Sequence, residues 1–107
     1  MEVSKEDWKL FREKIGSWQE DYMEKLIKQY VDFLNSDEAA STKFWKMDNR
    51  IKQDKKKPGV CLEINKHEML FDIARLLKDG VISFDDLVDF SDELKENVKY
   101  LQQRVSN

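Results

Sequence analysis

Hydrophobic residues in the stretch 8–34 recur at steps of three or four, the spacing of one face of an α-helix. Six of the eight are aromatic, and the full set is Trp8, Phe11, Ile15, Trp18, Tyr22, Leu26, Tyr30 and Phe33. A helix of this extent would be roughly 40 to 45 Å long, more than the width of a compact domain of this size. Its apolar face must therefore be covered by the other helices or by a second copy of the chain.

The ends and the middle of this helix carry recognisable signals. Ser4 is a suitable N-cap, and two acidic residues follow it in the first turn, where the helix dipole favours negative charge. Gly16-Ser17 is the weak point, because Ser17 and Glu20 form an S-x-x-E capping box at which a new helix could begin. The apolar face keeps its phase across this point, so we expect one continuous or gently kinked helix.

A second helix is predicted over residues 37–56. The polar residues 35–37 can end the first helix and cap the second, and Pro58-Gly59 stops the second helix. Residues 60–64 then alternate between apolar and other side chains, which is the period of a β-strand. We expect them either to pair with Val81-Ile82 or to pack over the core as an extended segment.

Two more helices complete the predicted fold. Asn65 caps a third helix that has almost no polar face, which makes it the central element, and Asp79-Gly80 closes it. Ser83 and Asp86 open a fourth helix that runs to Val105 and is expected to pair antiparallel with the first. The predicted fold class is all-α: a four-helix domain over residues 1–107 with one long N-terminal helix and at most a minimal two-stranded extended pair.

Catalytic and metal-binding signatures are weak throughout the chain. Nucleophilic catalysis needs a base beside a Ser or Cys, and the lone His67 and lone Cys61 are separated by a predicted helix cap. Glu68 and Asp72 stand four residues apart on a helix, a common spacing for surface carboxylates. The chain also has no glycine-rich phosphate loop. We therefore expect no enzymatic activity, no metal and no cofactor.

The chain has features typical of a cytoplasmic protein. A single cysteine cannot form an internal disulfide, which fits a reducing compartment. No apolar run approaches the length of a membrane span, and the N-terminus has no signal-peptide core. We expect a cytoplasmic location and no membrane partner.

Charge is segregated along the chain, although the net charge is only −3. The basic segment, residues 43–57, carries seven cationic residues against two acidic ones, and its flanks on both sides are acidic. Clustered cations beside an aromatic residue, here Trp45, are typical of phosphate binding and base stacking. The alternative is a solvated helix end whose cations suit its C-terminal dipole. The candidate nucleic-acid-binding residues are Lys43, Lys46, Arg50, Lys52, Lys55, Lys56 and Lys57.

Carboxylates of the predicted fourth helix form an acidic face that could dock on a basic protein surface, including one that normally holds nucleic acid. The simpler interpretation is solubility together with a favourable helix N-terminus. The acidic face comprises Asp85, Asp86, Asp89, Asp92, Glu93 and Glu96.

The aromatic residues at the start of the long helix are a second candidate surface. Trp8 and Phe11 lie where the other helices are not certain to reach, and aromatic residues dominate interface energetics. Burial in the core is the alternative. A self-complementary helix face could pair with its copy in a two-fold homodimer, so we count a second copy of the chain among the expected partners.

These features together predict a non-catalytic protein-binding module, an adaptor or inhibitor, that acts through the acidic face and the aromatic stripe. A nucleic-acid-binding protein that uses the basic segment is the alternative. The small size and the Lys-, Glu- and Asn-rich composition also resemble those of accessory proteins of bacterial mobile elements. That resemblance implies a further alternative, a mobile-element-encoded inhibitor of a host defence nuclease (anti-CRISPR-like).

Overall fold

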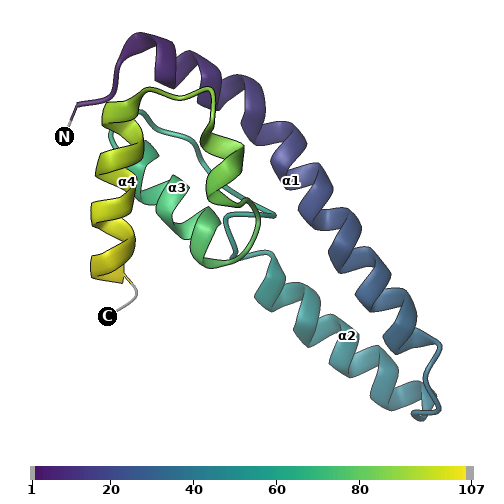
Figure 1. Ribbon diagram of the computed structural model, residues 1–107. Coiled ribbons are helices and arrows are strands. Elements are labelled where there is room, and N and C mark those ends of the chain that lie inside the picture. Colours follow the sequence, from purple (N-terminus) through teal and green to yellow (C-terminus); the bar gives the residue numbers. More distant parts are fainter. Residues whose placement is uncertain (1, 106–107) are drawn as a thin grey trace.

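The computed structural model describes residues 2–105 and confirms the all-α prediction, with no strand among those residues (Figure 1). The elements are α1 (Lys5–Leu34), α2 (Ala40–Asp54), α3 (Met69–Lys78), the short 3-10 helix η1 (Phe84–Leu87) and α4 (Asp92–Val105). The predicted N-cap of α1 is present, because the Ser4 side chain accepts a hydrogen bond from the backbone N–H of Asp7 at 3.1 Å. The helix runs through Gly16-Ser17 without a break, as the phase of its apolar face predicted.

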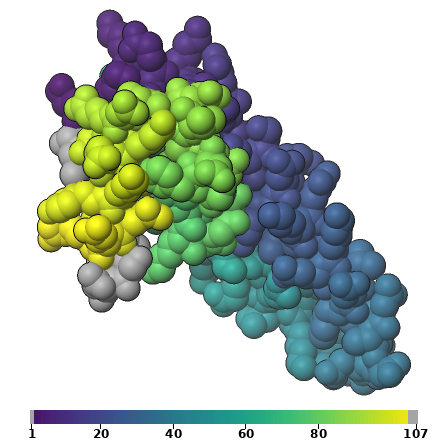
Figure 2. Space-filling view, in the orientation of Figure 1, coloured from purple at the N-terminus to yellow at the C-terminus, as the bar shows by residue number. Residues whose placement is uncertain are grey.

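The molecule is elongated, with extents of 51 × 30 × 22 Å. The N-terminal half of α1 packs with α3, η1 and α4 in a lobe, which we define as residues 2–22 and 58–105. The C-terminal half of α1 continues beyond the lobe and runs antiparallel to α2, forming an arm that we define as residues 23–57 (Figure 1). Figure 2 shows the arm, in blue and teal, projecting from the purple, green and yellow lobe.

The main hydrophobic cluster lies in the lobe, and Leu26 is the buried apolar side chain that the described part of the arm adds. The fully buried side chains of the cluster are Phe11 of α1, Leu87 of η1, Val98 of α4 and, on α3, Met69, Ile73 and Leu76. The prediction that the third helix is the most buried element is thus confirmed, and α4 packs chiefly on α3. The expected antiparallel pairing of the first and fourth helices is wrong as the main contact of α4, because α4 packs along α3 and, among the described residues, is hydrogen-bonded to α1 only at its start, through Ser91 and Asp7.

The predicted fourth helix is two elements rather than one. Its capping box is present, since the backbone N–H of Ser83 donates to Asp86 Oδ2 at 2.8 Å, but the helix that it opens ends at Leu87. A new helix starts at Asp92, where the Ser91 hydroxyl oxygen accepts from the backbone N–H of Leu94 at 3.1 Å. A serine whose hydroxyl takes a backbone partner favours a helix start over a helix interior.

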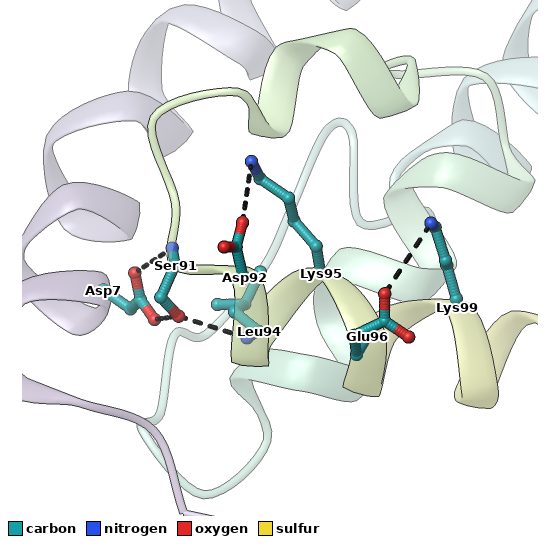
Figure 3. Close-up of polar contacts among 7 residues, drawn as sticks. All are labelled: Asp7, Ser91, Asp92, Leu94, Lys95, Glu96 and Lys99. Atoms are coloured by element: carbon teal, nitrogen blue, oxygen red, sulfur yellow. Dashed lines mark hydrogen bonds and ion pairs between the residues drawn. The ribbon is translucent and has the colours of Figure 1, made fainter.

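Ser91 also joins the two ends of the lobe. Its backbone N–H donates to Asp7 Oδ1 at 3.0 Å and its hydroxyl donates to Asp7 Oδ2 at 2.5 Å (Figure 3). Asp7 is buried, although it belongs to the first turn of α1. The negative charge of this carboxylate is therefore stabilised by the positive N-terminal end of α1, and its hydrogen bonds hold the start of α4 beside that end.

The connection from α2 to α3 packs as an extended segment, the second of the two predicted arrangements. Leu62 and Ile64 lie against the core without strand pairing, and Val81 and Ile82 are buried in the core itself. The connection is held to α1 by a hydrogen bond from Gln19 Nε2 to the carbonyl oxygen of Pro58 at 2.9 Å.

Two glycines on these elements have opposite surroundings and should respond oppositely to alanine. A Cβ on Gly59 would stand 2.5 Å from Tyr22 Cδ2 and 2.7 Å from Val81 Cγ2, whereas a Cβ on Gly16 would meet nothing within 4 Å. We expect Gly59→Ala to lower the free energy of unfolding by about 1–3 kcal/mol through overpacking. Gly16→Ala should raise it by about 0.5–1 kcal/mol, because alanine is the better helix residue at an exposed interior position. Urea titrations followed by circular dichroism measure both, and equal effects would contradict the packing of Gly59.

Candidate functional site

The start of α1 belongs to the core more than to any free surface. Phe11 has no exposed surface and Trp18 is buried, and their rings lie in a chain of contacts with Trp8 and Phe90, each with centroids 6.2 Å apart. Trp8 is half-buried, with the Arg12 guanidinium 5.3 Å from its ring centroid. The interface alternative is therefore wrong for Phe11, because α3, η1 and α4 all gather at this end of α1.

Exposed apolar side chains are found instead on the arm. Phe44 is 65% exposed and Trp45 66%, and their rings pack edge-on against each other with centroids 5.0 Å apart. Four aliphatic residues of the arm are also more than a third exposed. We call the whole set the arm flank: Ile27, Val31, Leu34, Phe44, Trp45 and Ile51.

Helical geometry places five of the six arm-flank residues on one side of the arm. At about 100° per residue, Ile27, Val31 and Leu34 form one stripe of α1, about a quarter turn from the positions that face α2. In the antiparallel α2, the residues at 44 and 51 fall on the matching side, whereas Trp45, about 100° further round the helix, points away from α1 and keeps only an edge contact with the Phe44 ring. The opposite side is identified by the hydrogen bond from Arg50 Nη2 to Gln29 Oε1, which joins the two helices there.

A buried carboxylate fastens the base of the arm. Asp54, the last residue of α2, is only 3% exposed and accepts a hydrogen bond from the Tyr30 hydroxyl of α1. Arg50 Nε lies 3.4 Å from Asp54 Oδ2, and Lys57 Nζ lies 3.3 Å from Asp54 Oδ1. Three donors around one carboxylate satisfy its charge and connect both helices of the arm.

These contacts shift two ionisation equilibria. Burial by itself would raise the pKa of Asp54, but the hydrogen bonds from Tyr30 and Lys57 and the positive charges of Lys57 and Arg50 outweigh it. The pKa of Asp54 therefore lies below its ordinary value, and the residue stays ionised. Burial, followed by the hydrogen bond to Asp54, raises the pKa of Tyr30 to about 12, which keeps its hydroxyl a donor.

The basic segment is partly neutralised by neighbouring carboxylates. Besides the two cations at Asp54, Lys46 Nζ lies 3.6 Å from Glu38 Oε1 and Lys52 Nζ lies 2.9 Å from Asp48 Oδ2. Four of the seven predicted nucleic-acid-binding residues thus have an acidic partner within the chain, which weakens the positive field that they present.

The six residues of the acidic face are all exposed, but they come from three successive pieces of chain. Two lie on η1, Asp89 lies in the connection, and the remaining three lie on α4. The expected continuous helix face is therefore wrong, because the helix breaks before Asp92. Several of these carboxylates make long surface ion pairs, including Asp92 with Lys95 at 3.8 Å and Glu96 with Lys99 at 3.9 Å (Figure 3).

The remaining chemical candidates lie apart from these surfaces. Cys61 and His67 are exposed, on the connection before α3. Glu68 is exposed, whereas Asp72 is buried with one oxygen, Oδ2, that has no hydrogen-bond partner among the described residues. Residues 2–105 contain no group of three or more His, Cys, Asp or Glu side chains placed to hold a metal ion.

The comparisons with known proteins found no match: no family model, no curated protein and no solved structure resembles this chain. Among the described residues, no helix has both the length and the apolar character needed to cross a membrane.

Replacing Asp54 tests how the arm is fastened. Asp54→Asn should lower the free energy of unfolding by about 1–3 kcal/mol at neutral pH, because it removes a buried acceptor of charged and hydroxyl donors. The control, Asp48→Asn, breaks a solvent-exposed pair and should cost about 0–1 kcal/mol. Because the pKa of Asp54 is lower in the folded than in the unfolded state, its ionised form stabilises the folded protein at neutral pH. This stabilisation is lost as the pH falls through the folded-state pKa, so the difference between Asp54→Asn and wild type should shrink there. Urea titrations at several pH values measure this, and an equal cost in both variants would contradict it.

Asp72 should show the opposite dependence on pH. Burial raises the pKa of Asp72; Arg75 lowers it in part, and Glu68 raises it. The folded state therefore binds the proton of Asp72 more tightly than the unfolded state does. The free energy of unfolding falls as the pH rises from the unfolded-state pKa of Asp72 to its folded-state pKa. We expect Asp72→Asn to gain stability relative to wild type between about pH 4 and about pH 7. Urea titrations at both pH values measure the difference, with the exposed Asp79→Asn as the control. A gain that does not change with pH would contradict it.

Proposed function

We propose that this chain is a non-catalytic protein-binding module, an adaptor or inhibitor, whose docking surface is the arm flank together with the acidic face. The observation that carries the proposal is the set of six large, exposed apolar side chains on the arm, five of them on one side and Trp45 at the margin against Phe44. Single exposed apolar residues are ordinary on soluble proteins, but a contiguous group of this size marks an interaction site.

The shape of the arm also supports the proposal. A pair of helices outside the core leaves two sides uncovered (Figure 1), and on one side of this arm large apolar residues are exposed. The Asp54 contacts hold the two helices in register before any partner arrives. A preformed surface loses little conformational entropy on binding, which favours a specific partner.

The acidic face supplies the second part of the surface. Three of its six carboxylates form ion pairs with lysines, at 3.5 to 3.9 Å, so the face is partly neutralised but keeps a net negative charge for a basic partner. A basic protein surface that otherwise holds nucleic acid would fit it. The inhibitor form of the proposal, including an anti-CRISPR-like protein directed at a defence nuclease, rests on this charge alone.

Nucleic-acid binding is the competing function, and the observation in its favour is the exposure of Phe44 and Trp45 next to Lys43 and Lys46. Exposed rings beside cations can stack with bases. The internal ion pairs of four of the seven cations count against it.

Affinity capture separates the two functions. Immobilised wild-type protein should retain one protein saturably, and nuclease treatment should not change the amount retained. Phe44→Ser with Trp45→Ser should weaken the capture at least about tenfold, the size expected for aromatic hot spots. Charge reversal at Asp89, Asp92 and Glu96 should also weaken it, by an amount that shrinks at high salt.

Phe71→Ser is the matched control, because Phe71 is 50% exposed but lies on α3 in the lobe, outside both the arm flank and the acidic face. It should retain the wild-type affinity. Retention that nuclease abolishes, or that depends on Lys55 and Lys56 and not on Phe44, would overturn protein binding in favour of nucleic acid.

A further inference from the structure

The side of the arm that carries the arm flank is complementary in charge to itself. The Gln29–Arg50 hydrogen bond sets which residues of α1 and α2 lie at the same level. Counting five residues toward the lobe along each antiparallel helix leads to Glu24 on α1 and to Lys55, the C-cap residue that follows α2, both exposed. At about 100° per residue, both fall on the side of the arm flank. At the lobe end, this side therefore has a net acidic edge on α1, where Glu20 and Glu24 outnumber Lys28, and a basic edge at Lys55.

The apolar part of this side runs between that charged end and the tip of the arm. Ile27 and Ile51 lie nearer the lobe, and Leu34 and Phe44 lie nearer the tip. A shallow groove of about 390 Å³ continues the apolar part toward the lobe and is lined by Glu20, Met23, Glu24, Ile27 and Lys28. A single surface thus combines an apolar strip with one edge of each charge.

The exposed area suits a dimer of this chain. From the exposed fractions, which run from 37% to 66%, the six side chains present on the order of 600 Å² of mostly apolar surface. That is at the upper limit for a free monomer and approaches the roughly 800 Å² that each partner buries in a standard interface. An arm of two helices joined to a second such arm would form a four-helix bundle with an apolar centre.

We infer that the arm flank binds a second copy of this chain, in a two-fold dimer whose axis runs along the arms. This orientation lays α1 of one copy beside α2 of the other, and Glu24 of one copy meets Lys55 of the other at both symmetry-related contacts. In the alternative dimer the two arms run antiparallel and α1 of one copy lies beside α1 of the other. The acidic lobe end of each α1 then meets the apolar Leu34 end of its copy. Charge complementarity thus selects the parallel arrangement.

This inference rests on the proposed docking role of the arm flank and names its occupant. The dimer presents two copies of the acidic face on one particle, so a partner with repeated basic sites would be bound with avidity.

Light scattering coupled to size exclusion tests the dimer on the full chain. Wild-type protein at micromolar concentration should have about twice the chain mass of 12.8 kDa and should remain a dimer at high salt, because the strip is apolar. Val31→Glu and Phe44→Ser should each give a monomer. Phe71→Ser should stay a dimer. Circular dichroism should show unchanged helix content in all three variants, since the replaced side chains are exposed.

A mixing experiment tests the orientation. Glu24→Lys places like charges at both contacts of its own dimer, and so does Lys55→Glu, so each variant alone should dimerise about tenfold or more weakly at low salt. An equal mixture of the two restores opposite charges at both contacts. The mixture should recover the wild-type dimer affinity.

Each other result has a definite meaning. A wild-type monomer at all concentrations overturns the dimer, as does a dimer that survives both Val31→Glu and Phe44→Ser. A dimer whose mixed charge variants show no recovery overturns the parallel arrangement. A monomer that still captures a different protein through Phe44 overturns the dimer and supports the proposed function, whereas a monomer that captures no protein overturns both.

Discussion

The length of α1 is the constraint on which the rest of the molecule depends. At 1.5 Å per residue, its 30 residues span about 45 Å, close to the full 51 Å extent of the molecule. The remaining helices have 10 to 15 residues each and cannot cover such a helix from end to end. The chain therefore concentrates α3, η1 and α4 at one end and leaves the other end with α2 alone. The lobe, the arm and the uncovered apolar side of the arm all follow from this mismatch in length.

Sequence patterns predicted the features that depend on neighbours in the chain. The Ser4 cap, the unbroken passage through Gly16 and the Ser83–Asp86 capping box are all local, and each is present. Gly80 closes α3 with a φ of 72°, the left-handed conformation that its position after Asp79 indicated. Backbone geometry over three or four residues decides such features, so a single sequence contains the information for them.

One error was local: Asn65 was predicted to cap the third helix, but α3 begins only at Met69, after a turn in which Asn65 Oδ1 accepts a hydrogen bond from the backbone N–H of His67. The errors of packing concern contacts between residues far apart in the chain. Ser91 fitted the apolar period of a continuous fourth helix, but Asp7, 84 positions earlier, gives it a better role as a helix start. Phe11 was a candidate interface residue but is buried, and the exposed apolar residues lie on the arm instead, because periodicity shows which face of a helix is apolar but not which length of it is covered. One overlooked signal was the adjacent pair Phe44-Trp45, since neighbouring residues on a helix point about 100° apart and a single partner helix cannot cover both.

Because α1 belongs to both the lobe and the arm, it makes the two parts thermodynamically dependent on each other. The other covalent connection passes through Pro58-Gly59, which is itself held against α1 by Gln19 and Tyr22. Leu26 is the buried apolar side chain of the arm, so we expect the outer turns of the arm to open at a lower free energy than the lobe. An occupant of the arm would slow amide hydrogen exchange first in the C-terminal turns of α1. Binding of such an occupant would also stabilise the lobe against unfolding, because the lobe and the arm share the helix α1.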